Sequence, residues 1–330
     1  MKVCVFGAGA IGGHLAGRLA KGGAEVSVVA RGPHLEAIRA KGLLVRAPDG
    51  DIHAPVRASM DPAELGPQDA VIVTVKAPAL PSVAAAIGPL LRPDTPVAFV
   101  MNGIPWWYFH AQGGPQDGMR LPKVDPEDAV WNAVGPQRAI GGVVYSACTV
   151  TAPGEVLVES QRSRVVLGEP DGARSPRAEA LAGVLRDGGL AMEVSERIRD
   201  SVWAKLLLNL GSGPLGVLTG CAPGGFYAEE ACREATRRIL AEGTAIARAM
   251  GCTVNPDAEG QIRNGATSAH KASILQDLEL GRPMEIDAIY GVPLDLARMM
   301  GVETPWLDVL VAMCRARSRE AGLYTDAARS

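Results

Sequence analysis

The sequence predicts an α/β chain that ends in a helical domain, and three observations predict it. Residues 2–6 form a short apolar run rich in β-branched side chains, which is typical of a buried parallel strand. A G-x-G-x-x-G motif follows at once. After about residue 196 the strand-like segments give way to helical periodicity. We therefore expect an N-terminal Rossmann-type dinucleotide-binding domain over residues 1–196 and an all-helical C-terminal domain over residues 197–330, with a cleft between them.

A glycine motif separates the first strand from the first helix. Its residues are Gly7, Ala8, Gly9, Ala10, Ile11 and Gly12. A motif between a strand and a helix is the context in which it binds dinucleotides. Gly7 allows the tight turn, Gly9 lets a pyrophosphate approach the backbone, and Gly12 lets helix and strand pack closely. The N–H groups at the helix start then face the anion. The alternative is a glycine-rich turn in an unrelated α/β protein.

The residue after the second strand selects between the two nicotinamide dinucleotides. That strand covers residues 25–30, and Arg31 follows it. NAD-binding proteins place Asp or Glu there to hold the ribose 2′-hydroxyl. A carboxylate would repel a 2′-phosphate, whereas Arg31 would attract it and can bind it with two hydrogen bonds. The sequence therefore predicts NADP(H) as the cofactor, with a solvated loop arginine as the alternative reading of Arg31.

Composition excludes several other classes of protein. The chain has 330 residues, of which 47% are apolar and 21% charged, as in an ordinary globular protein large enough for two domains. Its net charge of -3 argues against nucleic acid as the main partner. No apolar run reaches the roughly eighteen residues of a membrane helix, and the N-terminus does not read as a signal peptide. The six cysteines lack metal-ligand spacing, so we expect reduced thiols in a cytoplasmic protein without a bound metal.

The rest of the first domain follows from apolar periodicity. Helices are expected over residues 33–41, 80–91 and 177–186, and strands over residues 69–76, 96–101, 140–150, 155–158, 164–167 and 191–194. Residues 43–45 and 52–56 alternate around Pro48-Asp49-Gly50, which predicts a small hairpin. Lys76 and Asn102 stand at the carboxyl ends of two strands, where open α/β sheets bind ligands. Each has a plain alternative, as a surface lysine and as a turn residue.

An aromatic run and an irregular segment interrupt this pattern. Residues 106–109 read Trp-Trp-Tyr-Phe in a chain with only 4% aromatic residues. Residues 113–136 are rich in glycine and proline and lack periodicity. A long irregular excursion is often a lid or a partner surface. The alternative is a packed surface loop without a direct role.

Helices are expected throughout the C-terminal domain, over residues 197–210, 228–250, 258–262, 268–280, 285–300 and 305–318. Lys205 and Asn209 are four residues apart on the first of them and so share one face. Leucine and tryptophan surround Lys205, and an apolar setting disfavours its charged form. A lowered pKa would suit a general acid. The alternative is a lysine whose ammonium group reaches solvent.

A second candidate segment begins at Ser273 and ends with Glu285 and Asp287. Gly281 and Pro283 break the helix, so the two acidic residues open a new one. Acidic residues in a first turn complement the helix dipole and need no function. The segment alone therefore does not establish a site.

In order and spacing, these pieces resemble the 2-dehydropantoate 2-reductase (ketopantoate reductase) family nearly from end to end. The matching segments are the glycine motif, Arg31, Val75-Lys76-Ala77, Asn102-Gly103, Lys205-Leu206-x-x-Asn209, Ser273-x-x-Gln276-Asp277 and Glu285-Ile286-Asp287. The family reduces the ketone of 2-dehydropantoate with NADPH to give (R)-pantoate, a step towards pantothenate and coenzyme A.

The resemblance implies a role for each matching residue. Lys205 would be the general acid that protonates the developing alkoxide, and Glu285 would hold the same hydroxyl region. Ser273 would contact the substrate carboxylate, while Asn209 and Asn102 would orient substrate and nicotinamide. The groups that would hold NADP(H) are the glycine motif, Arg31, Lys76 and Asn102.

Two features depart from the family pattern. Family members carry further asparagines after the lysine helix as substrate hydrogen-bonders, whereas the matching positions here are Gly213 and Pro223. The segment from Trp106 to Pro136 is extra relative to compact members. A site that loses a hydrogen bond to a substrate hydroxyl loses discrimination for that hydroxyl.

The expected partner is therefore a small 2-oxo acid. 2-Dehydropantoate is the first choice, and a different 2-oxo acid is the alternative within the same class. A catalytically silent NADP(H)-binding sensor is the rival from another class, although Lys205 and Glu285 argue against it. The sequence does not determine the oligomeric state, and a homodimer is compatible with it.

Overall fold

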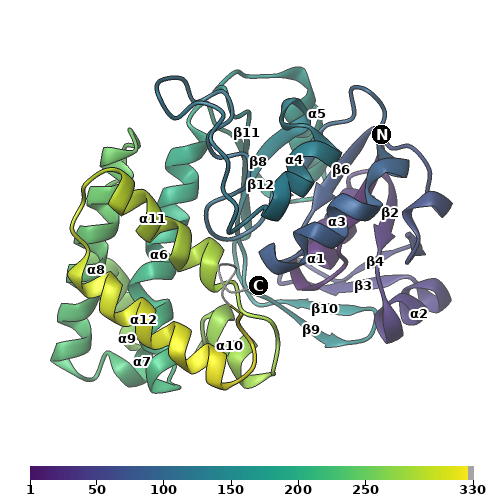
Figure 1. The fold of residues 1–330 in the computed structure, drawn as a ribbon. Helices are drawn as coiled ribbons and strands as arrows, with labels where there is room; N and C mark the ends of the chain where they lie inside the picture. The colour runs from purple at the N-terminus through teal and green to yellow at the C-terminus, as the bar shows by residue number, and fades with distance from the viewer. Residues whose placement is uncertain (326–330) are drawn as a thin grey trace. The chain divides into compact units, whose positions relative to one another are not determined.

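A computed structural model describes residues 1–325. The chain separates into two compact units (Figure 1). The first unit contains Met1–Met101 and Pro105–Ile198, and the second contains Asn102–Ile104 and the described residues from Arg199 onward. The short segment Asn102–Ile104 therefore groups with the second unit, although its neighbours in sequence belong to the first.

The first unit is built on an eight-stranded sheet with the strand order β12-β11-β8-β7-β6-β1-β2-β5. The neighbouring strands are parallel except for β8 and β11, which are antiparallel. The strands are β1 (Lys2–Phe6), β2 (Glu25–Val29), β5 (Arg57–Ser59), β6 (Ala70–Val73), β7 (Val97–Val100), β8 (Ala139–Tyr145), β11 (Arg164–Gly168) and β12 (Ala191–Val194). The predicted parallel α/β core is confirmed.

A second, four-stranded sheet has the order β4-β3-β10-β9. It contains β3 (Leu43–Arg46), β4 (Ile52–Ala54), β9 (Cys148–Ala152) and β10 (Glu155–Val158). The predicted hairpin is confirmed as antiparallel β3 and β4. A single strand over residues 140–150 was wrong, because the chain leaves the large sheet after Tyr145 and enters the small one at Cys148.

Helix α1 (Ala10–Lys21) lies between these two sheets and contacts strands of both. One face buries Leu15 and Leu19 completely in the core of the unit. The opposite face carries Gly13 and Gly17. A Cβ atom on Gly13 would lie 2.7 Å from Val156 Cγ2, and one on Gly17 would lie 2.6 Å from Val45 Cγ2. Glycine therefore lets the small sheet approach the helix backbone.

The other helices of the first unit are α2 (Gly32–Lys41), α3 (Leu80–Ala86), α4 (Ala129–Val134) and α5 (Pro176–Asp187). The helix predicted over residues 80–91 ends at Ala86, and a separate 3₁₀ turn, Gly88–Leu90, follows it. Helix α4 packs against α3 (Figure 1). It was not predicted, because its six residues are too few to establish a helical period.

The aromatic run at residues 106–109 is part of the core of the first unit. All four side chains are at most 1% exposed. The Trp106 ring stands edge-on to Phe99 of β7 and to Trp131 of α4, with centroids 5.2 and 5.8 Å away. This packing anchors the segment that sequence analysis left open as a lid, a partner surface or a surface loop.

The second unit is helical in its described part. It contains α6 (Ile198–Thr219), which begins at the last residue of the first unit, α7 (Pro223–Phe226), α8 (Glu230–Ala249), α9 (Ala258–Ala266), α10 (Ser273–Glu279), a π-helical turn (Asp287–Gly291), α11 (Val292–Met299) and α12 (Pro305–Glu320). The expected end of the first helix at residue 210 was wrong, since α6 continues through Pro214. Within the described residues no helix is both long and apolar enough to cross a membrane.

Arg18 of α1 is a buried cation, and each of its three side-chain nitrogens donates at least one hydrogen bond. Its terminal nitrogens donate to both carboxylate oxygens of Asp49, each at 2.6 Å, and one also donates to Gly188 O at 3.1 Å. Its Nε donates to Nε2 of His14 at 3.2 Å. Asp49 belongs to the turn between β3 and β4, so the ion pair fastens the small sheet to α1.

His14 is fully buried beside this ion pair. Its Nδ1 lies 3.4 Å from Ser146 Oγ and 3.5 Å from Cys148 Sγ. Burial, with a further contribution from the charge of Arg18, lowers the pKa of His14 to about 4. The Arg18 hydrogen bonds hold the pKa of Asp49 well below its usual range. The network therefore keeps a neutral imidazole beside a paired guanidinium at neutral pH.

We predict that His14→Gln flattens the acid side of the stability profile. The unfolded chain protonates His14 near pH 6.5, whereas the folded protein resists until about pH 4, so stability falls as the pH drops through this window. The loss between about pH 7 and about pH 5 should be about 2 kcal/mol in the parent. Urea unfolding of parent and variant at both pH values measures the difference. Glutamine keeps an acceptor for Arg18, and equal losses in the two proteins would contradict the prediction.

Candidate functional site

The glycine turn at residues 7–12 joins the ends of three strands in the first unit. Gly7 has a φ of 101°, which favours glycine. The N–H groups of Gly7 and Ala8 donate to the carbonyl oxygen of Val29 at the end of β2, at 3.1 and 3.3 Å. The Thr74 hydroxyl, just after β6, donates to Gly7 O at 2.6 Å. Thr74 was not predicted as part of the site, and its only signal in the sequence is a hydroxyl at the end of an apolar strand.

Gly9 and Gly12 differ in the space around them. A Cβ atom on Gly12 would overlap the carbonyl oxygen of Gly7, so the fold itself requires glycine there. A Cβ atom on Gly9 would meet no heavy atom within 4 Å. The first N–H groups of α1, including those of Ala10 and Ile11, have no acceptor within the helix. The open space at Gly9 therefore adjoins a group of backbone donors suited to an anion.

Arg31 lies two residues after the end of β2 at Val29 and is the N-cap residue of α2. The side chain is exposed, and among residues 1–325 it forms no ion pair. Because Val29 O holds the glycine turn, Arg31 starts only two residues from a backbone contact of the motif. Lys76 lies two residues beyond Thr74 and is half-buried. The structure thus gathers the predicted cofactor residues of the first unit around one turn.

Lys205 and Asn209 lie one turn apart on α6 of the second unit and are both half-buried. Trp203, Leu206 and Leu207 around them are buried. This burial lowers the pKa of Lys205, because it disfavours the charged ammonium group. The expected direction of the shift is confirmed.

Asn102 and Glu285 belong to segments that meet in the second unit. Ile104 N donates to Ala288 O at 2.9 Å. Gly103 has a φ of 81°, and a Cβ atom there would overlap Ala288 O. The Asn102–Ile104 segment therefore packs closely against the Asp287–Gly291 turn, which begins two residues after Glu285. Glu285 itself is only 5% exposed.

Ser273 is the first residue of α10, and its side chain is exposed. The next residue, Ile274, lies beside α6, with its Cγ2 3.6 Å from a Cβ atom placed on Gly213. Helix α10 thus brings Ser273 near the helix that carries Lys205 and Asn209. Pro223, the other departure from the family pattern, begins α7.

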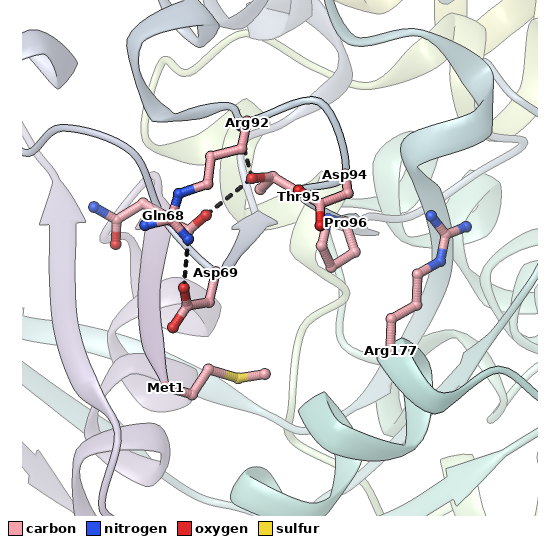
Figure 2. Close-up of a pocket in the computed structure, with 8 residues that line it drawn as sticks. All are labelled: Met1, Gln68, Asp69, Arg92, Asp94, Thr95, Pro96 and Arg177. Atoms are coloured by element: carbon pink, nitrogen blue, oxygen red, sulfur yellow. Dashed lines mark hydrogen bonds and ion pairs between the residues drawn. The ribbon is translucent and has the colours of Figure 1, made fainter.

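A pocket of about 260 Å³ in the first unit is a separate feature (Figure 2). Its lining residues are Met1, Gln68, Asp69, Arg92, Asp94, Thr95, Pro96 and Arg177. Several of them precede β1, β6 and β7, so the pocket lies at the amino ends of these strands, opposite the glycine turn. Arg92 is paired with Asp69, and Arg177 with Glu169. We therefore do not assign the cofactor to this pocket.

Metal and disulfide chemistry find no support in the described residues. Within residues 1–325, no group of three or more His, Cys, Asp or Glu side chains could hold a metal ion. All six cysteines are free thiols. Burial raises the pKa of Cys4 and Cys314 to about 12 and that of Cys148 to about 11, so these thiols stay protonated at neutral pH.

Comparison with known proteins covers nearly the whole chain. The family profile described as ketopantoate reductase PanE/ApbA matches residues 3–172, and its C-terminal counterpart matches residues 197–318. A protein named 2-dehydropantoate 2-reductase from Mesorhizobium japonicum is 43% identical over 327 residues, which cover 98% of this chain and 100% of the relative.

Solved structures agree with the sequence comparison. A structure from Ralstonia solanacearum MolK2 is 38% identical, with a TM-score of 0.90 over 98% of this chain and 99% of its own. The 2-dehydropantoate 2-reductase from Geobacter metallireducens GS-15 is 28% identical, with a TM-score of 0.83 over 96% and 99%. These matches confirm the resemblance first seen in the ordered motifs. The chain belongs to the ketopantoate reductase PanE/ApbA family.

Proposed function

We propose that this chain reduces the C2 ketone of 2-dehydropantoate with NADPH and yields (R)-pantoate. Family membership makes the chain a nicotinamide-dependent reductase of a small keto acid. One observation carries the finer proposal. This chain is 43% identical to a protein named 2-dehydropantoate 2-reductase, and its Lys205 lies among apolar side chains of a helix, where burial lowers the pKa of the lysine. That lysine is suited to donate a proton to a ketone oxygen.

The first unit offers the groups that a dinucleotide needs. The open space at Gly9 lets pyrophosphate oxygens accept hydrogen bonds from the first N–H groups of α1. Gly12 and Thr74 keep the turn in the shape that aims these donors. Lys76 adds positive charge from the end of β6. When bound, the nicotinamide supplies a hydride to the carbonyl carbon.

Lys205 is assigned to the ketone oxygen. As the new C–H bond forms, the π electron pair of the carbonyl moves onto oxygen, which gains negative charge. A protonated Lys205 stabilises that charge and then transfers its proton from Nζ to complete the alcohol. A lowered pKa makes this proton easier to give up, while water exclusion strengthens the electrostatic attraction.

The remaining residues are assigned to substrate orientation. Glu285 is buried and would accept a hydrogen bond from the hydroxyl region of the substrate. Asn209, one turn beyond Lys205, and Asn102, beside the turn that follows Glu285, would orient substrate and nicotinamide. Ser273 would donate its exposed hydroxyl to the substrate carboxylate.

NADP(H) is preferred over NAD(H) because of Arg31. The Arg31 side chain is exposed, its backbone lies two residues after the Val29 carbonyl that holds the glycine turn, and a 2′-phosphate matches its two-pronged geometry. No carboxylate occupies this position, although one would be needed to hold a free ribose 2′-hydroxyl.

A second candidate function is reduction of a different 2-oxo acid. Gly213 and Pro223 favour it, since neither side chain can donate a hydrogen bond to a substrate hydroxyl. A catalytically silent NADP(H)-binding sensor is less well supported, because the chain retains both Lys205 and Glu285.

The direct test compares substrates. Purified protein should oxidise NADPH fastest with 2-dehydropantoate when pyruvate and 2-oxoisovalerate are assayed beside it, and NADPH should outperform NADH. Faster turnover of another oxo acid would show that the substrate assignment is wrong and that the reaction type is right. Tight NADPH binding with no turnover on any oxo acid would identify a sensor instead.

Replacing Lys205 should remove proton donation but spare cofactor binding. We expect Lys205→Ala to lower kcat by about 10²–10⁴-fold, the usual contribution of a general acid. NADPH affinity, measured by fluorescence titration, should stay within about twofold. In the parent, kcat/KM should fall as the pH rises through the lowered pKa of the lysine, because only the protonated form donates. Unchanged turnover in the variant would remove Lys205 from the mechanism.

Replacing Arg31 should affect one cofactor selectively. Arg31→Ala should raise the Kd for NADPH by about tenfold or more and leave the Kd for NADH nearly unchanged, because only the former carries the 2′-phosphate. Arg186→Ala, which removes another exposed arginine of the same unit, is the matched control and should change neither. A parallel loss of both cofactors would show that the 2′-phosphate is not bound by Arg31.

A further inference from the structure

Tyr290 lies inside the Asp287–Gly291 turn of the second unit. Its side chain is fully buried, and its hydroxyl finds no hydrogen-bond partner among the residues that the structure describes. Burial raises the pKa of the Tyr290 phenol well above its usual range, so the group is a neutral hydroxyl at physiological pH. An unpartnered buried hydroxyl is costly, and native proteins generally pair such groups. A partner supplied by a ligand would remove that cost.

The Tyr290 hydroxyl occupies the space that a side chain at position 213 would need. A Cβ atom placed on Gly213 would overlap Tyr290 Oη, and it would lie 3.5 Å from Cζ of the same ring. Only glycine therefore fits at position 213 as long as the tyrosine hydroxyl keeps its present position.

Gly213 is the third member of a row of residues along one face of α6. Lys205, Asn209 and Gly213 follow one another at four-residue spacing, which places them on one face of the helix. The first two positions present an ammonium group and an amide. At the third, the polar group comes from the phenol of a different element. The row thus remains polar although its third residue has no side chain.

Two neutral side chains, Ile274 and Cys314, lie near this hydroxyl. Ile274 Cγ2 lies 3.6 Å from the Cβ position of Gly213. The Cys314 thiol is close enough to Tyr290 to influence its pKa. It donates to Pro214 O at 3.7 Å, and burial keeps it protonated. Such surroundings suit a neutral hydroxyl better than a carboxylate, which would need a compensating charge.

We propose that Tyr290 is the residue that selects the hydroxyl-bearing substrate, by hydrogen-bonding the alcohol of a hydroxylated 2-oxo acid in place of a side chain at position 213. The inference rests on the proposed function, in which 2-dehydropantoate carries that alcohol at C4. On this proposal, Gly213 does not mark the loss of the hydrogen bond to the substrate alcohol, because Tyr290 supplies that bond from another element. Tyr290 is assigned to substrate choice, and Lys205 keeps the chemistry.

The test compares Tyr290→Phe with the parent on two substrates. These are 2-dehydropantoate and 3,3-dimethyl-2-oxobutanoate, which is the same oxo acid without the hydroxyl. The variant should lose about tenfold or more in kcat/KM for the hydroxylated acid and less than about twofold for the analogue. NADPH affinity and Tm should remain near those of the parent.

A second pair of variants tests the geometry without relying on activity. Gly213→Ala should lower the Tm, because its Cβ overlaps the hydroxyl. The same change in a Tyr290→Phe background should be tolerated, since the nearest ring atom is then at an ordinary contact distance. Gly213→Asn in that background returns an amide to the row and should recover part of the preference for the hydroxylated acid.

The outcomes separate the two proposals. If the parent reduces 2-dehydropantoate but Tyr290→Phe keeps the same preference, or loses both substrates equally, the role of Tyr290 is overturned while the proposed function stands. If the parent does not reduce 2-dehydropantoate, the proposed function fails, and the role of Tyr290 fails with it. Additive effects of Gly213→Ala and Tyr290→Phe on Tm would contradict the overlap.

Discussion

The close approach of helix α1 to its neighbours is the constraint on which the first unit depends. At its start, Gly12 touches the carbonyl oxygen of Gly7, and along its length Gly13 and Gly17 face the small sheet. Any larger side chain would push the helix away from the turn or from a sheet. Because the helix is held on both sides, its first N–H groups have a fixed direction. The same packing that builds the core therefore orients the anion-binding end of the helix.

A helix covered on both faces also buries polar side chains, and the chain compensates for them locally. Arg18 would be very unfavourable in the interior without its ion pair to Asp49 and its bonds to His14 and Gly188. Asp49 belongs to the Pro-Asp-Gly sequence that favours the turn between β3 and β4. One turn residue thus shapes the hairpin and neutralises a buried charge, which links the small sheet to the helix that it covers.

Local patterns in the sequence predicted most of the fold, and long-range packing explains what they missed. The glycine motif, the first two strands and the hairpin depend on neighbours in sequence, so their signals are readable. The first C-terminal helix was expected to end at residue 210, yet α6 continues through Pro214 because its buried residues on both sides outweigh one lost hydrogen bond. The break after Tyr145 was missed because only two residues separate β8 from β9, although the two strands join different sheets. In the candidate site, the motifs located Lys205 and Glu285, but the contact of Thr74 with Gly7 spans 67 residues and leaves no local pattern.

Gly213 shows why a site is better compared in space than position by position. In the sequence alone, Gly213 reads as a position on the Lys205 face of α6 that lacks a hydrogen-bonding side chain. In the fold, the π-helical turn after Glu285 carries Tyr290, whose hydroxyl lies where a Cβ atom of residue 213 would be. A π turn adds a residue to the helix and rotates the side chains that follow, which is how a ring can be redirected without moving the helix axis. If Tyr290 binds the substrate alcohol as proposed, substrate recognition persists although the hydrogen-bonding group comes from another element, and the absence of a family asparagine alone is weak grounds for assigning a new substrate.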